Sequence, residues 1–119
     1  MHIEAIQQFC KSLPGVTEDI KWEDHLCFNI GGKMFLVTSL TNQPLTFSFK
    51  ATDDDFAELS HQPGFIPAPY MARHKWILCE DAAAVPQQQF ENLARQSYDL
   101  VKAKLPKKLQ KELEIRNQE

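Results

Sequence analysis

The sequence has no apolar run long enough to span a bilayer, and Met1–Ile6 lack a basic leader followed by an apolar stretch. We therefore expect neither a membrane protein nor a secreted one, and the expected location is the cytoplasm. Cysteine is also scarce, with three residues at wide spacing and no Cys-x-x-Cys motif. An odd number of separated cysteines argues against a disulfide framework, so buried, reduced thiols are expected.

Motifs for common catalytic and metal sites are missing too. No serine lies in a Gly-x-Ser-x-Gly setting, and Gly31-Gly32-Lys33 lacks the glycine spacing of a P-loop. His25 and Cys27 are the closest pair with ligand character, and two ligands do not make a zinc site. The run Asp53-Asp54-Asp55 is explained by capping at a helix start. We therefore expect no catalytic residue, no metal and no cofactor, and a protein that is not an enzyme.

Positive charge is not in excess, because 13 Lys and Arg stand against 16 Asp and Glu, for a net charge of −3 at pH 7. A net-acidic chain is by itself a poor case for nucleic-acid binding.

The chain has 119 residues, and 43% of its side chains are hydrophobic. These values are ordinary for one globular domain with its own core. We expect a single domain over 1–119, in which 105–119 form a basic helical tail.

Hydrophobic spacing predicts the secondary structure. Helices are expected at 3–13, 52–61 and 86–105, with a last helical piece after Pro106. Strands are expected at 26–30, 34–40, 45–49 and 76–79, the first two joined by a turn at Gly31-Gly32. The strand at 34–40 is apolar on both faces, which is typical of a central strand covered by helices. Residues 15–24 carry neither period and are expected to form a loop, with Trp22 against the core.

The stretch Pro63–Cys79 is the most distinctive in the chain. Three prolines fix φ and stiffen the backbone before the last strand, so this connection cannot be helical. Its apolar side chains predict a groove for a small ligand or another protein. The candidate groove residues are Phe65, Ile66, Tyr70, Met71 and Trp76.

Positive charge gathers locally in two places. The tail holds a run of lysines without an acid among them: Lys102, Lys104, Lys107, Lys108 and Lys111. Arg73, His74 and Lys75 precede the last strand, where Arg can reach guanine edges and His can stack on a base. A local patch can meet phosphates on an acidic protein, because fields fade over about 8 Å at physiological salt. Alternatively, the lysine run solvates a C-terminal helix and complements its dipole.

Several short motifs, taken in order, resemble the MmcQ/YjbR family of small bacterial proteins over essentially the whole chain. They are Leu13-Pro14-Gly15-Val16, Gly31-Gly32-Lys33-Met34-Phe35, Pro63–Met71 followed by Trp76, Ser97–Val101 and Lys104–Lys108. The resemblance implies a two-layer α+β fold, a curved antiparallel sheet with helices packed on one side, in the order α-β-β-β-α-β-β-α. That order adds a short strand within Phe65–Met71. The family is also similar in shape to secretion chaperones and to a double-wing DNA-binding domain.

On these grounds we expect a non-enzymatic DNA-binding protein. The tail lysines would position the DNA backbone, and Lys33, Arg73, His74 and Lys75 would lie near the contact surface. The alternative is a protein-interaction or small-ligand-binding module that uses the apolar groove beside the 63–71 loop. The expected partners are thus DNA or another protein, and not a membrane. The first hypothesis requires the tail lysines to lie beside Arg73 and Lys75, whereas the second requires an apolar groove without clustered positive charge.

Overall fold

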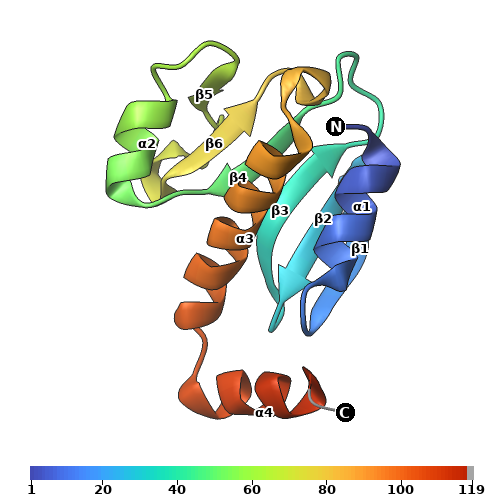
Figure 1. Cartoon of the computed structure of the whole chain (residues 1–119), viewed down its shortest axis with the longest axis vertical. Coiled ribbons are helices and arrows are strands. Elements are labelled where there is room, and N and C mark those ends of the chain that lie inside the picture. Colours follow the sequence, from blue (N-terminus) through green and yellow to red (C-terminus); the bar gives the residue numbers. More distant parts are fainter. Residues whose placement is uncertain (118–119) are drawn as a thin grey trace.

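The computed structural model describes the backbone of residues 1–117 and the side chains of residues 1–113. Its helices are α1 (Ile3–Ser12), α2 (Asp53–Leu59), α3 (Gln87–Ala103) and α4 (Lys107–Asn117). Its strands are β1 (Val16–Lys21), β2 (His25–Ile30), β3 (Lys33–Ser39), β4 (Phe47–Lys50), β5 (Phe65–Pro67) and β6 (Trp76–Cys79). The strands form one antiparallel sheet, and α1 and α3 lie against one of its faces (Figure 1). The expected α+β class, with a curved sheet and helices on one side, is confirmed.

The sheet has the order β1-β2-β3-β4-β6-β5. Its edge strand β1 lies where a loop was expected, and it pairs with β2 from Val16 opposite Ile30 to Lys21 opposite His25. The loop prediction was wrong because acidic residues in this stretch obscure the strand period. An edge strand tolerates such residues, since one of its sides faces water.

In the part of the chain that the structure describes, no helix is both long and apolar enough to cross a membrane.

β5 is the short strand that the family resemblance implied within the proline-rich stretch. Phe65 and Pro67 pair with Cys79 and Ile77 at the second edge of the sheet. The edge position suits Pro67, because its nitrogen has no hydrogen to donate to a further strand. Prolines had obscured this strand in the hydrophobic pattern, which on its own predicted a loop.

The core lies between the sheet and its covering helices. Phe90 of α3 contacts Phe47 of β4 and Phe9 of α1 edge to face, with ring centroids 5.2 and 5.9 Å apart. The predicted apolar faces of α1 and α3 both point into this layer. Cys10, Cys27 and Cys79 are buried free thiols, as expected. Burial raises the pKa of the Cys10 thiol far above its ordinary value.

Ser97 joins α3 to the middle of the sheet. Its side chain is fully buried, and Oγ donates to the carbonyl oxygen of Phe35 in β3 at 2.5 Å. The Oγ of Ser97 also accepts the backbone N–H of Lys50 at 2.9 Å. Because Lys50 is the last residue of β4, this hydroxyl holds the end of β4 beside α3.

Leucine side chains of α4 and of the turn before it pack against two glycines. Leu113 lies 2.7 Å from the place where a Cβ on Gly15 would stand, and Leu105 lies 2.6 Å from the corresponding place on Gly31. Both glycines have positive φ, 74° and 58°, so the turns need their conformational freedom as well as their small size. These contacts determine where α4 begins, and with it the position of its first lysines.

Ser97→Ala should lower the free energy of unfolding by about 1–3 kcal/mol, because it leaves a partly buried N–H and a buried carbonyl without their partner. Urea denaturation followed by circular dichroism measures the change. Ser12→Ala is the matched control, since this exposed hydroxyl donates only to a carbonyl of its own helix, and it should shift stability by less than about 0.5 kcal/mol. Equal effects of the two substitutions would contradict the assigned contact.

Candidate functional site

Positive side chains meet at the end of the sheet where β3 begins, β4 ends and β6 begins. Two surface hollows adjoin there, with volumes of about 290 and 380 Å³. We call the Lys and Arg side chains that line them the basic cluster: Lys33, Lys50, Arg73, Lys75 and Lys104. Lys50, Lys104 and His74 line both hollows, so the cluster is continuous.

The structure brings some of the predicted cations together and separates others. Lys104 lines the same hollow as Arg73 and Lys75, so the tail and the residues before β6 do meet. Lys102 lines neither hollow, since its ammonium lies over the ring of Tyr98 at 5.8 Å.

The remaining tail lysines are exposed on α4 and line neither hollow: Lys107, Lys108 and Lys111. They nevertheless start close to the cluster, because Pro106 lines the first hollow and α4 begins at the next residue. The tail therefore extends the positive surface rather than forming its centre.

Lys50 is the member of the cluster that the sequence analysis missed. Its Nζ donates to the backbone carbonyl of His74 at 2.8 Å, which ties β4 to the turn before β6. Partial burial lowers the pKa of its ammonium, and the positive charge of Lys104 lowers it further, while Asp53 acts in the opposite direction. Lys50 ends a strand of alternating pattern, and only the tertiary fold places Lys104 beside it.

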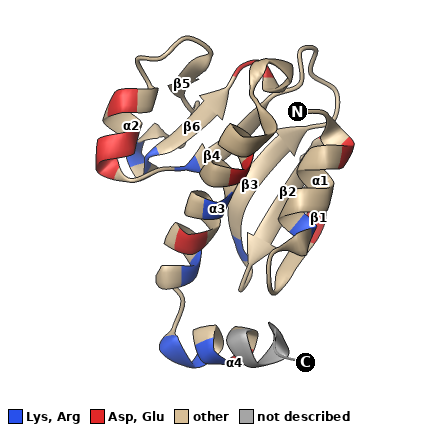
Figure 2. Cartoon of the chain, in the orientation of Figure 1, with Lys and Arg blue, Asp and Glu red and all other residues tan. Residues whose placement is uncertain are grey.

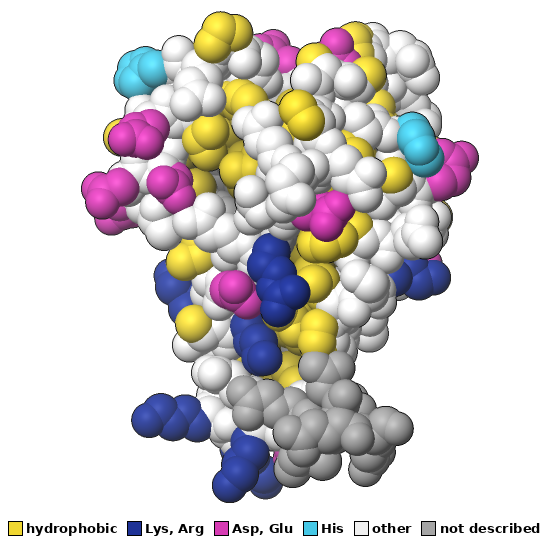
Figure 3. All heavy atoms as spheres, in the orientation of Figure 1, with side chains coloured by type: hydrophobic (Ala, Val, Ile, Leu, Met, Phe, Trp, Pro, Cys, Tyr) yellow, Lys and Arg dark blue, Asp and Glu magenta, His cyan; other side chains and the backbone are white. Residues whose placement is uncertain are grey.

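Acidic side chains border the cluster where α2 begins. Asp53 lines the second hollow, and Thr52 caps the helix by accepting the N–H of Asp55 at 3.1 Å, as the capping pattern predicted. Among residues 1–113, no cluster cation lies within 4.0 Å of a carboxylate. On the helix-covered face, Lys and Arg gather mainly toward α4, and Asp and Glu mainly toward the opposite end (Figures 2 and 3).

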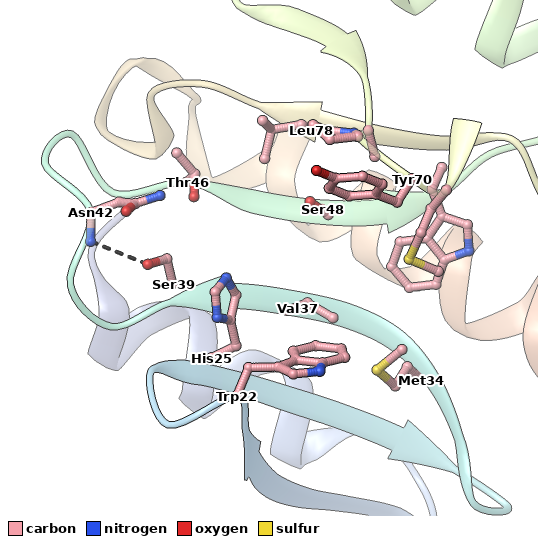
Figure 4. A pocket seen from close by; sticks show the side chains of 14 residues that line it. Trp22, His25, Met34, Val37, Ser39, Asn42, Thr46, Ser48, Tyr70 and Leu78 are labelled. Atoms are coloured by element: carbon pink, nitrogen blue, oxygen red, sulfur yellow. Dashed lines mark hydrogen bonds between the residues drawn. The ribbon is translucent and has the colours of Figure 1, made fainter.

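A larger pocket, of about 590 Å³, lies on the face of the sheet that α1 and α3 leave uncovered (Figure 4). Its floor is a row of register partners, Val37 of β3, Ser48 of β4 and Leu78 of β6. Cavities of this size commonly hold small molecules. β3 is a central strand, as its pattern predicted, and helices cover one of its faces, while its second apolar face is the floor of the pocket.

Two exposed aromatic side chains stand across this floor from each other. Trp22 comes from the turn between β1 and β2, and Tyr70 comes from the proline-rich stretch (Figure 4). Both have left-handed backbones, with φ of 53° and 66°, and their exposed fractions are 64% and 101%. The prediction that Trp22 packs on the core was therefore wrong. Left-handed non-glycine residues are strained, and they cluster at functional sites.

The structure places only some of the predicted groove residues at this pocket. Tyr70, Met71 and Trp76 line it. Phe65 does not, because β5 turns its ring to the helix side of the sheet, 6.4 Å from the ring of Phe49. Ile66 does not line it either. Trp22 and the floor residues were missed because they come from a turn and from strands that are distant from the proline-rich stretch in the sequence.

The imidazole of His25 lies at the rim of the pocket. Its Nδ1 donates to Asp24 at 2.7 Å, and Asp24 also accepts from the hydroxyl of Thr41 at 3.0 Å. The hydrogen bond from Thr41 and then that from His25 lower the pKa of the Asp24 carboxyl.

No group of three or more His, Cys, Asp or Glu able to hold a metal occurs in the described part of the chain. The pair of His25 and Cys27 therefore gains no third ligand there.

Comparisons with known proteins identify the family of the domain. The model of the family described as YjbR matches residues 11–100. A crystal structure of a Deinococcus radiodurans protein with a DUF419 domain is similar, with 28% identity, a TM-score of 0.84, and coverage of 93% of this chain and 86% of that one. A protein from Pseudomonas syringae, at 16% identity, shares the fold with a TM-score of 0.71 over 84% of this chain and 98% of its own. No curated protein matches.

The two tryptophans should report the two sides of the pocket separately. With Trp76→Phe, the remaining Trp22 should emit at long wavelength and be quenched strongly by acrylamide, because it is 64% exposed. With Trp22→Phe, the remaining Trp76 should emit at shorter wavelength and resist quenching, because it is 4% exposed. Similar quenching constants in the two variants would show that the exposed wall formed by Trp22 is absent in solution.

Proposed function

Because the chain belongs to the YjbR family, its fold has a counterpart of known structure, and we propose that it uses this fold to bind DNA without catalysing a reaction. The phosphate backbone lies on the basic cluster and continues along the start of α4. The membership confirms the resemblance drawn from the sequence motifs. The case for DNA rests on charge and position, since a fold alone does not imply an activity.

One observation carries the proposal: cations from β3, from β4, from the end of α3 at Lys104 and from the turn before β6 meet in two joined hollows, free of ion pairs among the described side chains. Neighbouring positive charges repel each other: after partial burial, the charge of Lys104 is the second cause that lowers the pKa of Lys50. A phosphate placed between such charges relieves the repulsion, and it releases the counterions that surround DNA.

The net charge of −3 does not oppose this interaction. At physiological salt a charge acts over about 8 Å, so DNA on the cluster is screened from acidic side chains at the opposite end of the molecule. The exposed lysines that α4 adds beside Pro106 lengthen the surface available to a strand. Asp53, next to the cluster, limits the surface on the α2 side.

Fluorescence anisotropy with a short labelled duplex at low salt tests the proposal. Changing both Arg73→Gln and Lys104→Gln should weaken binding. The slope of log K against log salt concentration should become shallower by about 1.8, since each phosphate contact contributes roughly 0.9. Lys102→Gln should have a smaller effect than Lys104→Gln, because the ammonium of Lys102 lies over Tyr98.

The matched control is Lys11→Gln with Arg95→Gln, which removes the same charge from α1 and α3 and touches neither hollow. It should leave the salt slope close to that of the unmodified protein. If both double variants lose the same affinity, the cluster is not the contact surface. The absence of any binding at micromolar protein would refute DNA binding altogether.

A further inference from the structure

We propose that the pocket between Trp22 and Tyr70 takes an unpaired base of a DNA strand whose phosphates lie on the basic cluster, so that single-stranded DNA is the preferred form. This inference rests on the proposed function and identifies the kind of DNA involved. The three grounds for it are the junction of the two sites, the aromatic walls of the pocket and the polar groups at its rim.

The pocket and the basic cluster adjoin at Trp76. Its side chain lines both the pocket and the first hollow, and its partner across the strands is Lys50. On β3 the same junction occurs between consecutive residues, because Lys33 lines the hollow and Met34 lines the pocket. A ligand that crosses this junction meets cations on one side and an apolar cavity on the other. A nucleotide unit of a strand has this combination of an anionic phosphate and a flat, weakly polar base.

The walls of the pocket are suited to stacking. Trp22 and Tyr70 are far more exposed than aromatic residues packed in a core, and each occupies a left-handed backbone position. Strain of this kind persists only where the surrounding structure determines it, and it is common at ligand sites. Aromatic side chains on an exposed surface, beside a cationic groove, are how many proteins hold single strands.

Polar groups at the rim can contact the edge of a base. His25 uses Nδ1 to donate to Asp24, which leaves Nε2 as its second ring nitrogen. The side chain of Asn42 offers both donors and an acceptor, and the hydroxyl of Ser48 lies in the floor. Ser39 is less available, because its Oγ accepts the backbone N–H groups of Thr41 and Asn42. Such mixed donors and acceptors suit heteroaromatic edges better than a purely aliphatic ligand.

A paired base cannot use this pocket. In a duplex both faces of each base are stacked and its pairing edge is occupied, so a base must leave the stack before aromatic side chains can hold it. The basic cluster alone would accept the phosphates of either form. The pocket therefore predicts a difference between single strands and duplexes that charge alone would not produce.

The experiment measures the affinity of the full chain for three labelled oligonucleotides of equal length: a single strand, the corresponding duplex, and an abasic strand that keeps the phosphates. The single strand should bind about tenfold or more tightly than either of the others, because stacking is lost in both. Trp22→Leu and Tyr70→Leu should each remove roughly that advantage without changing the salt slope. Tyr70→Phe, which keeps the ring, should bind like the unmodified protein.

Ile20→Ala is the control for an exposed apolar residue outside the pocket, and it should leave binding unchanged. If the duplex and the abasic strand bind as tightly as the single strand, or if the leucine variants keep full affinity, base binding in the pocket is refuted while DNA binding through the cluster stands. If none of the three oligonucleotides binds, both proposals fail. A free nucleoside that binds the pocket while no oligonucleotide does would also overturn the inference, since it would make the site one for small molecules.

Discussion

The packing of α3 across the centre of the sheet is the contact on which both candidate sites depend. Ser97 hydrogen-bonds to β3 and to the end of β4, and the hydroxyl of Tyr98 donates to the carbonyl of Pro14 at 2.6 Å. With the helix held in this way, its last turn lies beside the end of β4, and Lys104 comes next to Lys50. The same helix occupies only one face of the sheet, which leaves the other face open for the pocket.

The positive cluster and the open face each carry an energetic cost in the isolated protein. Like charges gathered at one end of the sheet repel one another, and the pKa of Lys50 is lowered first by partial burial and then by the positive charge of Lys104. Apolar side chains on the open face, among them Val37 and Leu78, remain in contact with water. One ligand could relieve both costs, because a polyanion with flat bases would neutralise the basic cluster and cover the apolar side chains of the open face.

Much of the fold follows from local patterns. Helical spacing placed α1, α2 and α3 within a few residues, and the glycine pair at 31–32 placed the β2–β3 turn, since these signals lie within one element. β1 was missed because Glu18 and Asp19 break its alternation, and its pairing with β2 stabilises it as a strand. The candidate site was predicted less completely. The sequence pointed to Arg73, Lys75 and Lys104, but it contained no signal that joins them to Lys50 or joins Tyr70 to Trp22.

The amino-acid sequence by itself determined the helix faces, the hairpin turn and the excess of lysine near the end of the chain, because each is a property of neighbouring residues. The fold class followed from the resemblance of its motifs to a known family. Only the tertiary structure decided which cations share a surface and which aromatic side chains face each other. Lys33 and Lys104 meet through the register of the strands and the docking of α3. Such contacts join residues that are far apart along the chain, and they depend on how whole elements pack rather than on any local period.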